Sequence, residues 1–264
     1  MNKFYMIPSD KQLDKYTEEL ILPLENYSIG FDTYFSLEEI NDISKNRIVN
    51  VIINRFMHKK DIYDLKDIIN NLKFNVKLFF IEDLGLTSII PSDRVVLYQS
   101  HLINNYLSIN AFKELGIENI VINNDLTINE IKTIKDKTDS NIFIVSSGVN
   151  TLMYSRRHLL TSYFDYKNID NHKMDYTIVE SASKKPLMIK EEDNGTIILN
   201  DRIFSLNKYF SVLDAFNFIV NFNNLNEENK NILLNHYKDL DLSNYLNVDD
   251  YFLDNEIIYK VGEK

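Results

Sequence analysis

The sequence predicts an α/β fold, a single TIM-barrel-like (β/α)8 domain, from three observations. Short, nearly continuous apolar runs recur along the chain, as expected of parallel strands that are buried on both faces. Segments with apolar residues at helical spacing lie between these runs. Between about residues 165 and 215 the regular alternation of strand-like and helix-like segments is interrupted, which indicates a small antiparallel β insertion between strands 7 and 8. An open, doubly wound parallel sheet is the alternative fold.

The elements follow from these runs in chain order. The expected strands cover residues 4–7, 27–31, 48–53, 76–81, 94–98, 119–122, 141–145 and 216–222. The expected helices cover residues 36–45, 61–73, 106–116, 127–137 and 226–240, and residues 148–164 are also expected to be helical. Two helix starts, Ser36 with Glu39 and Thr127 with Glu130, fit the capping-box pattern.

The insertion has its own strand signals. YTIVES, PLMIKEE and GTIILN are expected to form antiparallel strands, with a turn at Asp193-Asn194-Gly195. We therefore expect a barrel-like domain over residues 1–240, with this insertion, and a C-terminal tail over residues 241–264.

Composition and charge restrict the function. The chain of 264 residues is 44% hydrophobic and 26% charged, which is typical of a globular protein. Its net charge of −10 opposes binding to RNA or to an anionic membrane, so we expect RNA contact only through a partner and no membrane contact. The absence of cysteine excludes disulfides, thiolate nucleophiles and cysteine-held metal clusters.

The start of the sequence and the motif search point to a cytoplasmic protein without a common cofactor. MNKFYMIPSD lacks the basic start and long apolar stretch of a signal peptide, and no apolar run approaches the roughly 18 residues of a spanning helix. The phosphate-binding, dinucleotide-binding, zinc-protease and hydrolase-elbow motifs are all absent. The five histidines show no metal-ligand spacing, so we expect neither a metal nor a cofactor.

In a barrel, the functional site lies at the carboxyl ends of the strands. We expect ligand contacts there from three amides, Asn54, Gln99 and Asn104. Asp83 and Asp125 are the candidate general bases, and Arg157 is the candidate clamp for a carboxylate-bearing small molecule.

Several stretches resemble one family. YSRRHLLTSYF (154–164) is similar to a Y-S-G-R-C-L-L-S-x-Y segment, and YTIVES and EEDNGTIILN are similar to Y-x-L-V-E-E and E-E-D-x-x-G-T-Y-I-L-N. Upstream, VIINRF, FIEDLG, QSHLINN and VINNDLTINEI also match in the same order. These segments resemble those of the collagenase-like peptidases of family U32, and the resemblance runs from about residue 27 to residue 206.

The resemblance implies a barrel-like α/β fold. Family members are described as peptidases, whereas better understood relatives hydroxylate tRNA uridine, ribosomal RNA or a quinone precursor without oxygen. In those relatives, four cysteines hold an iron–sulfur cluster.

This chain departs from the family at the cluster. Aligned on Tyr154 and Arg157, the first cysteine position is Thr151 and the second is His158. The third position falls within the shortened segment YKNIDNHKM, and the fourth falls near Ser205. The family's H-G pair is Ser147-Gly148 here, and its R-E pair is Asn124-Asp125. A cluster with thiolate ligands cannot form, which suggests that the family chemistry is lost.

The segment around Arg157 keeps two family residues, Tyr154 and Arg157, which the expected helix would place one turn apart on one face. Together with Asp83 and Asp125, they are the candidate catalytic residues. Arg157 has two interpretations: contact with an anion, or an ion pair with Asp83 or Asp125. Arg156 is expected to be solvated and His158 to be satisfied locally. His101 and His172 are expected to have no role in a site.

Three functional hypotheses follow. The favoured one is a non-catalytic or accessory subunit of an RNA-uridine hydroxylation system, or a related one, acting with a cysteine-bearing paralogue. The second is a residual peptidase, hydrolase or lyase that uses the polar residues at the carboxyl ends of the strands. The third is a barrel that binds an anionic small molecule without turnover.

Overall fold

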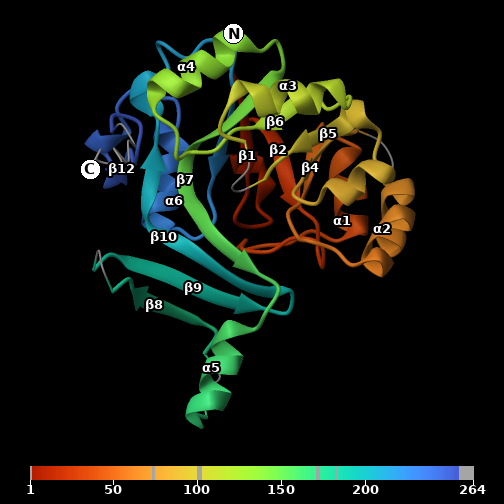
Figure 1. Cartoon of the computed structure of the whole chain (residues 1–264), viewed down its shortest axis with the longest axis vertical. Coiled ribbons are helices and arrows are strands. Elements are labelled where there is room, and N and C mark those ends of the chain that lie inside the picture. Colours follow the sequence, from red (N-terminus) through yellow and green to blue (C-terminus); the bar gives the residue numbers. More distant parts are fainter. Residues whose placement is uncertain (1, 73–74, 100–102, 171–172, 182–183, 256–264) are drawn as a thin grey trace, which may run out of the picture.

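Eight parallel strands close into a barrel, as shown by the computed structural model, which describes residues 2–72, 75–99, 103–170, 173–181 and 184–255 (Figure 1). The strands are β1 (Lys3–Ile7), β2 (Glu19–Pro23), β3 (Val49–Ile53), β4 (Val76–Ile81), β5 (Val95–Leu97), β6 (Asn119–Val121), β7 (Asn141–Ser155) and β11 (Asn217–Asn221). Each is parallel to its barrel neighbours, and β11 pairs with both β1 and β7. The predicted barrel is therefore confirmed, and the open sheet is excluded.

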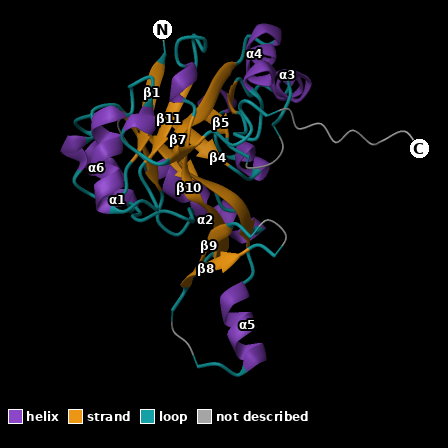
Figure 2. Cartoon of the chain, turned by 90° about the vertical axis from the view of Figure 1, so that its left-hand side faces the viewer, coloured by secondary structure: helices purple, strands orange, loops and turns teal. Residues whose placement is uncertain are grey.

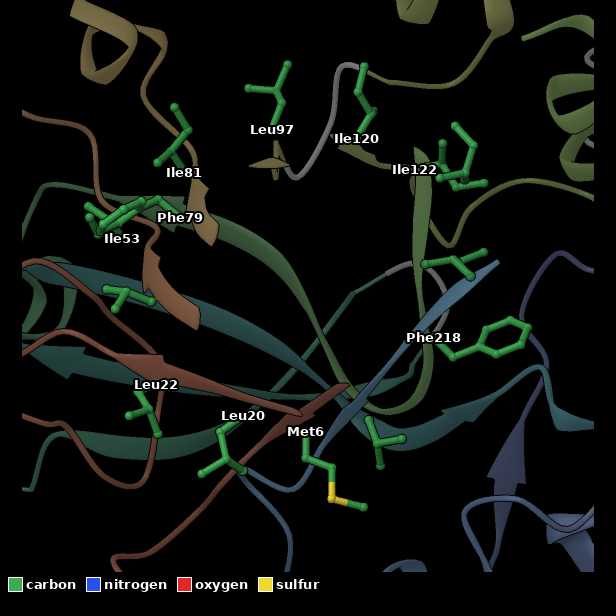
Figure 3. Close-up of a cluster of buried hydrophobic side chains, with 14 of the residues drawn as sticks. Met6, Leu20, Leu22, Ile53, Phe79, Ile81, Leu97, Ile120, Ile122 and Phe218 are labelled. Atoms are coloured by element: carbon green, nitrogen blue, oxygen red, sulfur yellow. The ribbon is translucent and has the colours of Figure 1, made fainter. Parts of the chain in front are cut away.

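Residues that alternate along the strands form two apolar layers. One layer fills the barrel, and its strand residues are Tyr5, Ile7, Ile21, Ile52, Leu78, Phe80, Val96, Val121, Phe143, Val145 and Ile219. The other layer lies between the strands and the helices, and Figure 3 shows 14 of its side chains, among them Met6, Leu22 and Phe218. Because both faces of each strand are buried, the strands have the continuous apolar runs seen in the sequence.

Five of the helices that the structure describes lie around the barrel, four in connections between consecutive strands and one after the last barrel strand. They are α1 (Leu37–Ser44), α2 (Lys59–Asn71), α3 (Tyr106–Glu114), α4 (Ile128–Lys137) and α6 (Glu227–His236). The predicted capping boxes begin α1 at Ser36 and α4 at Thr127. The connection from β1 to β2 contains only a 3₁₀ turn, Leu13–Lys15, and that from β4 to β5 contains Leu84–Ser88 and Ser92–Arg94.

One predicted strand is wrong. Residues 27–31 lie in a loop, and the second barrel strand is β2, Glu19–Pro23. The loop is apolar because it packs on the barrel: Ile29 is 1% exposed, and the Ser28 hydroxyl donates to the carbonyl of Ile52 at 2.7 Å. Burial alone therefore produced the strand-like composition of this segment.

The insertion between β7 and β11 is an antiparallel sheet, as predicted. It contains β8 (Asp175–Val179), β9 (Pro186–Glu192) and β10 (Gly195–Ser205), and the β9–β10 turn lies at Asp193-Asn194. The second half of β7 leaves the barrel and pairs with β10. Helix α5 (Leu159–Lys167) follows β7. We call α5, β8 and β9 the arm, which projects away from the barrel in two perpendicular views (Figures 1 and 2).

The helix expected over residues 148–164 is wrong in its first half. Residues 148–155 belong to β7, whose ladder with β10 pairs Thr151 with Leu199 and Tyr154 with Ile197. Long-range pairing thus decides the conformation of a stretch whose local pattern favoured a helix. Tyr154 and Arg157 consequently do not share a helix face, because the helix begins only at Leu159.

The segment after α6 packs on the barrel. It contains a 3₁₀ turn, Leu242–Asn244, and the short strand β12 (Val248–Asp249), which pairs with β10. Leu242, Leu246 and Leu253 are buried in the outer layer. The division between a domain over 1–240 and a tail over 241–264 stays a prediction. In the described part of the chain, no helix is long and apolar enough to cross a membrane.

Candidate functional site

A cavity of about 380 Å³ lies at the carboxyl end of the barrel. Its floor and walls include inward-facing residues at or just beyond the strand ends, namely Asn54, Glu82, Tyr98, Asn123 and Asn221. Each continues the alternation of the inner layer, two residues beyond Ile52, Phe80, Val96, Val121 and Ile219 respectively. The cavity is therefore the open end of the barrel interior, where the apolar filling gives way to polar side chains.

One wall of the cavity is the loop that contains Ile29, Gly30 and Phe31. The amide of Asn54 holds this loop, since its Oδ1 accepts from the Ile29 N–H at 2.9 Å and its Nδ2 donates to the Ile29 carbonyl at 3.0 Å. Gly30 has a φ of +87°, and a Cβ there would lie 2.4 Å from the Cδ1 of Ile197. The positive φ therefore favours glycine at this position, and a larger residue would also displace the end of the Ile197 side chain on β10.

The opposite wall comes from β7 as it leaves the barrel and from the insertion. Gly148 has a φ of +134°, and a Cβ there would lie 2.5 Å from the carbonyl oxygen of Asn221. Thr151, Leu152 and Tyr154 of β7 line the cavity, together with Ile197 and Leu199 of β10. The close crossing of β7 over the end of β11 therefore depends on a glycine in the left-handed region.

Two adjacent carboxylates of β9 connect the insertion to its surroundings. Glu192 Oε1 accepts from the Gly30 N–H at 3.2 Å, and its Oε2 accepts from the Tyr34 hydroxyl. Glu191 accepts from the Leu160 N–H at 2.7 Å and from the Thr161 N–H at 3.3 Å. Glu192 thus fixes the loop wall of the cavity, and Glu191 fixes the first turn of α5.

The two carboxylates have opposite pKa shifts. Burial raises the pKa of Glu192 above its ordinary value, against the hydrogen bonds from Tyr34 and Gly30. Burial acts in the same direction on Glu191, but hydrogen bonds from Thr161 and Leu160 outweigh it and lower the pKa. Arg156 and Arg157 are both exposed, so solvent screens their charges from the N-terminus of α5.

The cavity lining is acidic and rich in phenol rings. It contains four carboxylates, those of Glu82, Asp125, Asp201 and Asp249, and two cations, Lys185 and Arg202. Arg202 pairs with Asp249 at 3.0 Å. Tyr98, Tyr154 and Tyr251 also line the cavity, and burial raises the pKa of each phenol. These charges favour a neutral or cationic ligand with an apolar part over the anionic ligand suggested by the arginines.

Three of the predicted site residues, Asn54, Asp125 and Tyr154, line the cavity. The other four lie outside its lining. Asp83 faces away and accepts from the backbone N–H groups of Met57 at 2.9 Å and Gly85 at 2.8 Å.

Gln99 donates to the carbonyl of Glu82 at 3.1 Å, and Asn104 accepts from Asn123 at 2.7 Å. Arg157 lies exposed in the turn before α5, and among the described residues no ion pair joins it to Asp83 or Asp125. The catalytic and ligand-binding roles of all seven residues stay predictions.

The predicted site residues did not include Glu82, Tyr98, Asn123 and Asn221, although Glu82, Asn123 and Asn221 are polar residues at expected strand ends. The signal that identifies them is the two-residue alternation of the strands, because a polar residue two places after a barrel-filling residue points to the same side. Asp83 and Gln99 follow Glu82 and Tyr98 directly and therefore point to the other side. His101 and His172 lie outside the described residues.

The side chains at the three assigned cluster-cysteine positions do not fit an iron–sulfur cluster held by thiolates. Thr151 lies in β7 and Ser205 lies at the end of β10, and neither offers a thiolate. His158 has a ring nitrogen 3.2 Å from the carbonyl of Asp193, the local contact expected of it. Within the described ranges, no group of three or more His, Cys, Asp or Glu side chains could hold a metal ion.

Fold and cavity together define a (β/α)8 barrel with a ligand-sized cavity at the carboxyl end of its strands, where proteins of this architecture hold their ligands. The sequence model of peptidase family U32 matches residues 18–227, and the chain belongs to that family. The resemblance seen in the sequence is thereby confirmed, in a member that has no cysteine. No curated protein and no solved structure matched the sequence.

Proposed function

We propose that this chain is a non-catalytic, accessory member of peptidase family U32 that acts beside a cysteine-bearing paralogue in RNA-uridine hydroxylation or a related reaction. One observation carries the proposal: the barrel and its cavity are complete, but thiolates are absent from the positions that hold the family's cluster. A scaffold without its redox ligands is expected in a subunit that binds or positions, while its partner performs the chemistry.

The charge of the chain supports a pair in which the partner, and not this chain, contacts the RNA. A net charge of −10 opposes the RNA phosphates, so the partner would supply the basic surface for RNA.

Affinity purification of the tagged chain from its native host tests the proposal. Mass spectrometry of the eluate should identify a cysteine-bearing member of the same family, and iron should co-elute with it. Recovery of this chain without such a partner, colourless and free of iron, would contradict the accessory role.

The cavity favours a second candidate function, the binding of a small molecule in the barrel. A volume of about 380 Å³ lies within the range of small-molecule sites, and the lining combines phenols with an excess of carboxylates. An organic cation, held by aromatic faces and by Asp125 and Asp201, would fit this chemistry.

Thermal unfolding with benzyltrimethylammonium and with the dicarboxylate succinate tests this second candidate. The cation should raise the melting temperature of the wild-type chain and have a smaller effect on an Asp125→Asn, Asp201→Asn double variant, whereas succinate should have no effect in either. A larger effect of succinate than of the cation would instead favour the hypothesis of an anionic ligand.

A residual peptidase, hydrolase or lyase at the same cavity would add turnover to binding. Alanine at Asp125 and at Tyr154, the two predicted catalytic residues that line this cavity, tests the catalytic roles suggested for them. Unchanged activity and binding in both variants would exclude those roles.

A further inference from the structure

Strand β8 forms the edge of the insertion's sheet, beside helix α5, whose Phe164 ring lies 5.6 Å from the ring of Tyr176. β8 is the last strand of the sheet and pairs with β9 on one side, and none of the described segments pairs with its other side. Natural edge strands are usually interrupted by proline, lysine or a bulge. β8 has the sequence DYTIV, and its register with β9 runs without a shift. It therefore presents a regular edge for further strand pairing.

The hydrogen bonds to β9 show which backbone groups face outward. The Met174 carbonyl accepts from the Glu191 N–H at 2.8 Å, and the Glu180 N–H donates to the Lys185 carbonyl at 3.0 Å. Alternate residues of an antiparallel strand direct their backbone groups to the same neighbour. The even-numbered residues of β8 thus face β9, and the N–H and C=O groups of Asp175, Thr177 and Val179 face the open edge.

This edge is complementary to itself. In an antiparallel pair of two copies centred on Thr177, Asp175 lies opposite Val179 of the second copy, and Thr177 lies opposite its equivalent. All three pairs are then of the hydrogen-bonded type, since each joins residues whose backbone groups face outward. No like charges are opposed, and Tyr, Thr, Ile and Val all favour strands.

The distribution of charge also favours self-association through the arm over association through the rest of the chain. The chain as a whole carries a net charge of −10, so two copies repel each other. Residues 156–193 contain seven basic and seven acidic side chains and are formally neutral. The arm projects from the barrel in both views, which keeps two acidic barrels apart when the arms meet (Figures 1 and 2). Val179, 61% exposed, and Thr177 lie accessible on this edge.

We propose that two copies of this chain associate by antiparallel pairing of their β8 strands, which joins the two insertions into one continuous sheet. A five-residue strand pair buries less surface than the roughly 1,200 Å² of a stable complex, so the dimer dissociates on dilution. The proposal is independent of the accessory role, because it concerns two identical chains and is tested with the purified chain alone.

Sedimentation equilibrium of the full chain over a range of concentrations tests the proposal. The wild type should show a reversible monomer–dimer equilibrium. Thr177→Pro removes the central outward N–H and leaves the ladder to β9 intact, and it should abolish the dimer. Thr177→Val keeps that N–H and is the matched control, which should dimerise like the wild type. A wild type that is monomeric at every concentration, or a proline variant that dimerises equally well, would overturn the proposal.

A charge exchange tests the register. Val179→Asp should weaken the dimer about tenfold, since it opposes Asp175 with a second carboxylate at two symmetric places. Adding Asp175→Lys should restore the dimer, because the introduced lysine then lies opposite the introduced carboxylate of the other copy. Failure of the second substitution to restore association would contradict antiparallel pairing centred on Thr177, even if the proline variant failed to fold.

Discussion

Glu191 caps helix α5 from the neighbouring strand, and we predict that Glu191→Ala destabilises the arm. The side chain of the N-cap residue of α5, His158, accepts no hydrogen bond from the helix. Instead, the Leu159 N–H donates to the Thr196 hydroxyl at 2.9 Å, and Glu191 accepts from the Leu160 N–H at 2.7 Å and from the backbone and hydroxyl of Thr161. One carboxylate thus satisfies two of the first N–H groups of the helix.

The magnitude follows from these contacts. Hydrogen bonds to a charged group contribute about 1.5–3 kcal/mol each, and bonds that share one acceptor are not additive. We therefore expect a loss of about 3 kcal/mol for the arm in Glu191→Ala. Glu191→Gln keeps an acceptor but loses the charge that favours the helix N-terminus, and it should cost about 1 kcal/mol.

Hydrogen exchange read by mass spectrometry measures this effect locally. Peptides that cover α5 should exchange about a hundredfold faster in Glu191→Ala at neutral pH, while peptides from β1 to β4 stay protected. Because hydrogen bonding lowers the pKa of Glu191, its stabilisation is present above the ordinary pKa of a glutamate and is lost as the pH falls through the lowered value. Unchanged α5 exchange in the alanine variant would refute the capping role.

Three further predictions concern the cavity walls. Burial raises the pKa of Glu192, so the contribution of this side chain to the free energy of unfolding is present below the ordinary pKa of a glutamate and is lost as the pH rises through the raised value. In urea titrations, the stability of Glu192→Gln relative to wild type should therefore increase from about pH 4 upward. A difference in stability that stays constant with pH would contradict this prediction. Gly148→Ala should cost about 2 kcal/mol or more in the same assay, since its Cβ would meet Asn221, whereas Gly85→Ala, at an exposed turn, should cost less. Asn54→Ala removes both bonds to Ile29, and limited proteolysis should then cleave the loop at residues 29–31 faster than in wild type; equal rates would count against this anchor.

The barrel can be predicted because its strands are buried on both faces and therefore leave an unambiguous pattern. The apolar runs at 48–53 and 76–81 form β3 and β4, since an interior layer and a helix-facing layer both require apolar residues. The same rule fails at residues 27–31, where a loop buried in the mouth of the barrel has the same composition as a strand. Apolar content reports burial and does not by itself report conformation.

Part of the site can be predicted from strand ends, and part cannot. Asn54 follows β3 on the inward side, so the strand end alone identifies it. The strand end does not separate Asp83 from Glu82; the alternation of β4 does, because Phe80 and Glu82 share one face. The contacts of Glu191 with α5 and of Glu192 with Gly30 join segments about 30 and 160 residues apart, and no local pattern predicts them.

The accessory role is tested most directly by native mass spectrometry of the tagged chain isolated from its host. We predict a complex in which this 31.1 kDa chain is bound to a cysteine-bearing protein of the same family, with iron and sulfide retained in the complex. The β8 dimer, in contrast, would have twice the mass of this chain and contain no second protein. Detection of only the free chain or its homodimer, without a family partner and without iron, would contradict the accessory role.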